Sequence, residues 1–117
     1  MTVLKLRILF DDAMLGPGKA ELLARIRDTG SISAAGRQMG MSYKRAWMLV
    51  EEMNRAFRAP VVTSTRGGAG GGGAEVTEAG EAVLRLYRAV VERAAEAAAV
   101  ELAELEAMLR PAGAAGA

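Results

Sequence analysis

The chain has 117 residues, of which 51% are hydrophobic and 25% charged, which is enough for one domain with its own core. It contains neither cysteine nor histidine, and this excludes a disulfide framework, a thiolate metal site and histidine as a general base. The net charge is only +1, but residues 16–58 carry eight basic and four acidic side chains, a net +4, whereas residues 81–117 carry four arginines and six glutamates, a net −2.

Residues 3–10, VLKLRILF, begin the chain with alternating apolar and basic side chains. This period of two predicts a half-buried strand, and the DDAMLGPGK that follows is predicted as a loop. Leu22, Leu23 and Ile26 then share one face of a short amphipathic helix, residues 19–28, which Gly30 ends.

Two further helices are predicted from their capping residues. Ser31 caps a helix over residues 32–39 that stops at Gly40, and Ser42 caps a longer one over residues 43–58 that stops before Pro60. The apolar side chains of the longer helix recur at helical spacing, so they are expected to face the core: Ala46, Leu49, Val50, Met53 and Phe57.

Short strand-like segments, residues 61–65 and 74–76, flank a glycine run in which six of the seven residues 67–73 are glycine. A phosphate-binding P-loop needs lysine directly after its last glycine, but here Ala74 and Glu75 follow. A linker is disfavoured because no complete domain flanks the run. We therefore predict the tip of a hairpin, where glycine permits positive φ and close approach to another backbone.

Thr77 is a good N-cap for one long helical pattern, residues 78–110, followed by a tail, residues 111–117. About 30 residues reach roughly 45 Å, beyond what a domain of this size can cover. The far apolar positions would be exposed in a monomer, so an antiparallel or crossed homodimer is predicted. The dimerisation residues would be those recurring at spacings of three and four: Leu84, Tyr87, Val91, Leu102, Leu105 and Leu109.

Residues 30–53 contain two capped helices joined at Gly40, with the small Ala34 and Ala35 suited to a close helix crossing. These features are typical of a helix-turn-helix, whose second helix contacts base edges through its N-terminal residues. That helix begins Ser42-Tyr43-Lys44-Arg45, and arginine is suited to guanine. The basic middle of the chain agrees with a polyanionic partner. The alternative is an ordinary helical hairpin with surface charges, and Trp47 is expected to pack inward.

The stretches GSISAAGRQMGMSYKRAWMLVEEMN, GGAGGGG and VTEAG closely resemble the N-terminal domain of the ModE family over residues 15–87. These are molybdate-responsive transcriptional regulators related to the LysR type. The resemblance implies an α+β, mostly α fold: a winged helix-turn-helix domain over residues 1–77, with the helix-turn-helix at about 31–58 and the wing at about 61–76, and a long dimerisation helix over residues 78–110. It also implies a homodimer on a palindromic operator.

Carried over by position, the recognition helix would present Ser42, Tyr43, Lys44 and Arg45 to DNA. The wing would present Arg66, Gly67, Gly68, Gly70 and Gly71, and the remaining candidates for the DNA backbone are Ser31, Ser33 and Arg37. The wing departs from the family, because Ala69 stands within the run that usually holds lysine and Arg66 is its one basic residue.

The chain ends before the oxyanion-binding modules of such regulators, so we expect no cofactor or metal in this chain. Molybdate sensing would need a separate domain or partner. The predicted setting is cytoplasmic, since neither a signal peptide nor a membrane-spanning run is visible. The predicted protein is a DNA-binding regulator and no enzyme. Two alternatives stay open: an interaction module that partners a separate molybdate sensor or a full-length paralogue, and an anion-binding enzyme.

Overall fold

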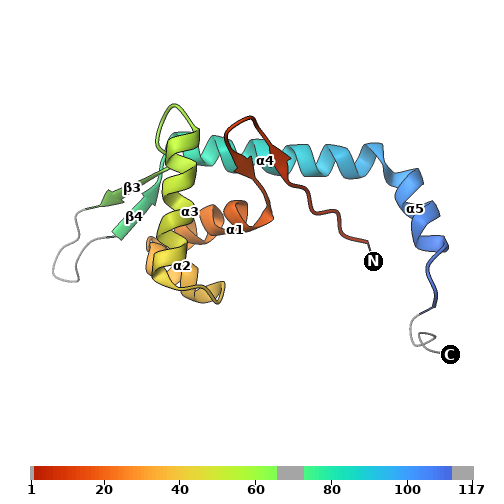
Figure 1. Cartoon of the computed structure of the whole chain (residues 1–117), viewed down its shortest axis with the longest axis horizontal. Coiled ribbons are helices and arrows are strands. Elements are labelled where there is room, and N and C mark those ends of the chain that lie inside the picture. Colours follow the sequence, from red (N-terminus) through yellow and green to blue (C-terminus); the bar gives the residue numbers. More distant parts are fainter. Residues whose placement is uncertain (1, 66–72, 112–117) are drawn as a thin grey trace.

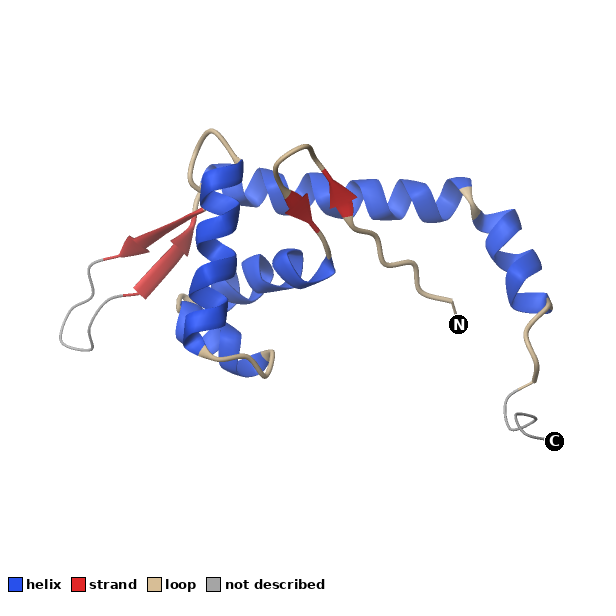
Figure 2. Ribbon diagram, in the orientation of Figure 1, coloured by secondary structure: helices blue, strands red, loops and turns tan. Residues whose placement is uncertain are grey.

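The computed structural model describes residues 2–65 and 73–111, and it is mostly helical with two small antiparallel sheets (Figures 1 and 2). Its elements follow one another as β1 (Ile8–Leu9), β2 (Met14–Leu15), α1 (Pro17–Thr29), α2 (Ile32–Gln38), α3 (Tyr43–Ala56), β3 (Val62–Thr65), β4 (Gly73–Val76), α4 (Glu78–Ala97) and α5 (Ala99–Ala107). Helices α1 to α3 and the β3–β4 hairpin lie at one end of α4, and α5 lies at the other (Figure 1). The predicted mostly helical winged fold is confirmed.

The N-terminal prediction is largely wrong. Only Ile8–Leu9 of the predicted strand is extended in a sheet, and it pairs with Met14–Leu15 inside the predicted loop. The preceding residues have no strand beside them; instead the Tyr87 hydroxyl donates to the carbonyl of Leu6. Helix α1 starts at Pro17, two residues earlier than predicted, because proline at the first helical position needs no backbone N–H.

The predicted caps are confirmed. The hydroxyl oxygens of Ser31, Ser42 and Thr77 each accept a hydrogen bond from the backbone N–H three residues later. Gly30 and Gly40 have φ of 70° and 72°, so the turns after α1 and α2 use the left-handed conformation that glycine adopts without strain.

The core has two parts. The first joins α1, α2, α3 and the hairpin, and its buried members are Leu22, Leu23, Ile26, Ala35, Ala46, Val50, Met53, Val61, Val62 and Ala74. The second joins β2 and α1 to the first half of α4, with Leu15, Ala20, Ala24, Leu84 and Tyr87 buried. The predicted inner face of α3 is confirmed, since Leu49 and Phe57 also pack against the first part.

The crossing of α2 and α3 depends on Gly36 as well as on Ala35. A Cβ at Gly36 would lie 2.8 Å from the Cβ of Ala46, which is closer than two carbon atoms can pack. The sequence predicted a close crossing through Ala34 and Ala35; the structure moves the tightest contact to Gly36.

The predicted single helix over residues 78–110 is wrong. Helix α4 ends at Ala97, and α5 begins at Ala99 after a bend at Ala98, where φ is −101° and ψ is 14°. Neither proline nor glycine stands at the bend, so no local sequence signal predicts it. Helix α5 buries no side chain. At the other end, Leu84 and Tyr87 are core residues of the same chain, so they are not free to contact a second copy.

Candidate nucleic-acid interface

The N-terminus of α3 is open to solvent. The Ser42 hydroxyl accepts from the backbone N–H of Arg45 at 3.1 Å, and Tyr43, Lys44 and Arg45 are all exposed. The unpaired N–H groups and the positive end of the helix dipole favour an anion there. The four predicted recognition residues therefore form one exposed polar turn.

A groove of about 310 Å³ runs between α3 and the β3–β4 hairpin. Residues of α3, the N-terminal end of α2 and both strands line it: Ser31, Ile32, Ser33, Tyr43, Trp47, Val50, Glu51, Asn54, Val62, Thr63, Ser64, Thr65, Gly73 and Ala74. The fold thus brings the predicted Ser31, Ser33 and Tyr43 together with the strands of the predicted wing. Hydroxyl groups on both sides of the groove can donate to phosphate oxygens.

Trp47 does not pack inward as the sequence predicted. Its side chain is 45% exposed and lines this groove, one helical turn after Tyr43. The inner face of α3 is filled by Ala46, Val50 and Met53, and this leaves the indole at the edge. Met48 of α3 is also exposed.

The other predicted DNA-binding residues that the structure describes do not line this groove. Lys44 and Arg45 are exposed but do not line the groove, and Arg37 is exposed at the end of α2. At 100° per residue, Arg45 lies near the stripe of Glu52, which pairs with Lys19 of α1. The predicted wing residues Arg66, Gly67, Gly68, Gly70 and Gly71 lie outside the described residues.

Both strands of the hairpin are anchored to the helices. Asn54 of α3 accepts from the backbone N–H of Val61 at 2.8 Å and of Val62 at 3.2 Å, and donates to the Val62 carbonyl at 3.1 Å. The N–H of Ala74 donates to the Gly30 carbonyl at 2.9 Å. These contacts fix the hairpin relative to α3, and so they fix the width of the groove.

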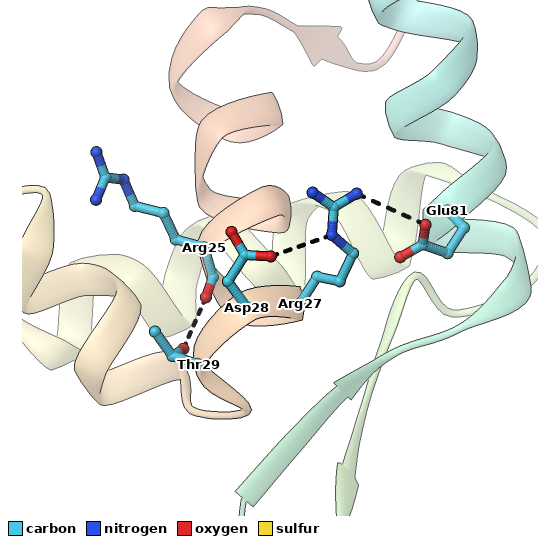
Figure 3. A network of polar contacts seen from close by, with 5 residues as sticks. All are labelled: Arg25, Arg27, Asp28, Thr29 and Glu81. Carbon is cyan, nitrogen blue, oxygen red and sulfur yellow. Dashed lines mark hydrogen bonds and ion pairs between the residues drawn. The ribbon is translucent and has the colours of Figure 1, made fainter.

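Several basic side chains of residues 16–58, the basic stretch, form ion pairs within the fold. The Arg27 guanidinium lies 3.4 Å from the Asp28 carboxylate and 3.8 Å from the Glu81 carboxylate, and the second of these pairs links α1 to α4 (Figure 3). The Thr29 hydroxyl donates a hydrogen bond to the Arg25 carbonyl at 2.7 Å. Such exposed pairs each stabilise by only about 0–1 kcal/mol. The basic residues of the stretch outside such pairs are all exposed: Arg37, Lys44, Arg45, Arg55 and Arg58. Three of these lie on α3.

A larger cleft, about 790 Å³, lies on the other side of α3 and includes Asp11, Asp12 and Glu52. The buried Lys19 amine there donates to the Met14 carbonyl at 3.0 Å and lies 3.1 Å from the Glu52 carboxylate. The lining of this cleft also includes Arg55, and Glu51 is the one charged side chain among the described residues that line the groove, so charge does not distinguish the two surfaces. The groove beside the hairpin is the better candidate interface because the predicted Ser31, Ser33 and Tyr43 line it.

The described residues hold no group of three or more acidic side chains placed to bind a metal ion. Over the same ranges, no helix has the length and apolar character to span a membrane.

Comparison with known proteins relates this surface to a family. Residues 18–81 match the bacterial regulatory helix-turn-helix proteins of the lysR family. The chain is 51% identical over 78 residues to the molybdenum-pterin-binding protein MopB of Rhodobacter capsulatus, a stretch that covers 67% of this chain and 29% of that protein. It is 42% identical over 71 residues to the transcriptional regulator ModE of Yersinia pestis, and 41% identical over 71 residues to the DNA-binding transcriptional dual regulator ModE of Escherichia coli K12; each covers 61% of this chain and 27% of the relative.

The chain thus spans less than a third of the length of these relatives. The matched residues run from the start of α1 to the first turn of α4, so they include α3, the hairpin and the groove between them. By this match the chain belongs to the lysR family of bacterial regulatory helix-turn-helix proteins.

Proposed function

We propose that the protein is a sequence-specific DNA-binding transcriptional regulator of the ModE type, linked to molybdenum metabolism. The observation that carries this proposal is the exposed polar N-terminus of α3 beside the groove that α3 forms with the β3–β4 hairpin. Relatives named as ModE regulators support it, and no enzymatic step is part of it. A protein acting on operator DNA would work in the cytoplasm.

In this proposal α3 enters the major groove with its first turn. Arg45 or Lys44 reads guanine, and Tyr43 contacts a thymine methyl or the backbone. Ser31, Ser33 and Arg37 hold phosphates on one side, and Arg66 with the neighbouring glycines holds them on the other. The phosphate contacts orient the protein, and the base contacts select the site.

We further propose a homodimer on a two-fold-symmetric operator. Leu86 is 59% and Val90 is 44% exposed, and they lie four residues apart on the same side of α4. Helix α5 adds the exposed Val100 and Leu105, and the exposed Leu109 follows its end; Leu105 and Leu109 were predicted from the sequence. Because Leu84 and Tyr87 already pack within the domain, the proposed interface is the adjacent Leu86–Val90 side of α4, extended by α5.

In this proposal molybdate or a related oxyanion acts through a separate domain or partner, since the similarity covers only 27% of the length of the ModE relatives. The exposed apolar side of α4 and α5 also favours a second candidate function, an interaction module that pairs with a separate sensor or a full-length paralogue.

A gel-shift titration against DNA selected from a random library distinguishes the two. The regulator predicts specific complexes whose log affinity falls steeply and linearly with log salt. In this assay Arg45→Ala should relax base preference and weaken specific binding by about 1–3 kcal/mol. Arg66→Ala should weaken binding to all sequences alike and reduce the salt slope by about one. Absence of any complex at low salt would favour the interaction module.

A further inference from the structure

Glu51 is an acidic residue on the side of α3 that faces the hairpin. Its side chain is half-buried and lines the groove together with Trp47 and Thr63. Glu51 follows Lys44 by seven residues, which is two helical turns, so both residues lie on one stripe of α3. This stripe is opposite the buried Ala46 and Met53.

The neighbouring Glu52 has a different environment. Its carboxylate pairs with the buried Lys19 amine at 3.1 Å and lines the cleft on the other side of α3. Among the ion pairs and side-chain hydrogen bonds of the described residues, none involves Glu51. Two adjacent carboxylates of the same helix therefore differ in their surroundings. Glu52 forms an ion pair within the fold, and Glu51 lines the groove.

We infer that Glu51 is a specificity-determining residue, which accepts a hydrogen bond from the exocyclic amine of cytosine in the major groove. This inference rests on the proposed function. A carboxylate next to DNA is repelled by phosphates, so it lowers affinity for every sequence in which it finds no donor. The cytosine N4 amine is the donor that aspartate and glutamate accept from in the major groove. Glu51 therefore selects by penalising other bases as well as by binding cytosine.

The geometry also sets where the cytosine lies. Seven residues of helix correspond to about 10.5 Å, which is close to about three base-pair steps of roughly 3.4 Å each. Because a helix in the major groove is inclined to the DNA axis, the base contacted by Glu51 should lie at most about three base pairs from the one contacted by Lys44.

The test is selection of binding sites from a random library by the whole chain and by Glu51→Gln, which keeps the shape of the side chain and removes its charge. Wild type should select cytosine at one position in each half-site. Glu51→Gln should lose that preference or change it to adenine, which glutamine binds, with discrimination at that position falling by about 5- to 150-fold. Its affinity for non-selected DNA at low salt should rise about threefold.

Two controls remove the same charge elsewhere: Glu52→Gln on the same helix and Glu92→Gln on α4. Both should keep the wild-type base preferences, and thermal unfolding of each variant shows whether it is folded. If Glu51→Gln selects the wild-type sequence at every position, the inference is wrong while the proposed function stands. If wild type binds no DNA, the proposed function is wrong and the role of Glu51 is wrong with it.

Discussion

Asn54 holds the first residue of β3 through both of its backbone groups: the side-chain amide donates to the Val62 carbonyl at 3.1 Å, and its oxygen accepts from the Val62 N–H at 3.2 Å. The same oxygen accepts from Val61 at 2.8 Å. A single side chain of α3 thereby supplies hydrogen-bond partners to backbone groups at the start of β3 that would otherwise lack them.

Replacing Asn54 by alanine should lower the free energy of unfolding by about 2–3 kcal/mol, because about 1 kcal/mol is lost for each hydrogen bond and the partner groups lose theirs. Asn54→Asp keeps the acceptor and loses the donor, so its free energy of unfolding should lie between those of wild type and Asn54→Ala. Urea denaturation measures both. A change below about 0.5 kcal/mol for alanine, the usual range for a surface substitution, would show that the contacts do not fix the hairpin.

Gly80 should tolerate no side chain. It lies in the first turn of α4, where a Cβ would overlap the Val61 carbonyl oxygen and lie 2.7 Å from a Val76 methyl group. Gly80→Ala should therefore destabilise the protein by about 1–3 kcal/mol, as overpacking does.

Gly18→Ala is the matched control, since a Cβ there meets nothing within 4 Å in the first turn of α1. It should stabilise by up to about 1 kcal/mol through helix propensity alone. Thermal unfolding compares the stabilities of the two variants with that of wild type. Equal changes in stability would mean that the close approach of Gly80 to Val61 does not exclude a side chain.

Stability should fall at alkaline pH through Tyr87. Burial raises the pKa of its phenol above the ordinary value of 10.0, and the hydroxyl needs its proton to donate to the Leu6 carbonyl. Below pH 10 both the folded and the unfolded chain hold this proton, so the contribution is complete. Above pH 10 the unfolded chain loses it first, and the free energy of unfolding falls by at most about 1.4 kcal/mol per pH unit until the raised pKa is reached.

Tyr87→Phe removes this titration. Urea unfolding between pH 8 and 11 should therefore give a shallower loss of stability for Tyr87→Phe than for wild type. Parallel curves would contradict a role for the Tyr87 proton.

The sequence predicted those elements whose signals are local. The caps Ser31, Ser42 and Thr77 predicted the starts of α2, α3 and α4, and Pro60 predicted the end of α3 to within two residues. The strand at residues 14–15 was missed because its pairing with Ile8–Leu9 depends on a neighbour and not on its own pattern. Helical spacing identified the inner face of α3 correctly, but Trp47 lies at the edge of that face and lines the groove, which the spacing alone does not reveal.

The break at Ala98 was missed for a related reason: an alanine-rich run reads as continuous helix. The dimer interface remains a prediction. Because Leu84 and Tyr87 are buried within the domain, we now expect the exposed Leu86 and Val90 to form its part on α4.

Lysine at both Leu86 and Val90 should therefore produce a monomer of 12.2 kDa in light scattering, whereas wild type should have twice that mass. Charges in an apolar interface cost more than the contacts they replace. Leu9→Lys on the exposed face of β1 is the control, and it should stay dimeric. A wild-type monomer at micromolar concentration would contradict the proposed interface.

In the proposed complex, two copies of α3 read one symmetric DNA site, and hydroxyl-radical footprinting of a selected site can show this arrangement. We expect two protected half-sites related by two-fold symmetry, with centres about 10–10.5 base pairs apart or a multiple of that distance, since each copy places one α3 in the major groove. A single protected half-site, or two in direct repeat, would contradict the symmetric dimer, and the absence of any protection at low salt would contradict DNA recognition itself.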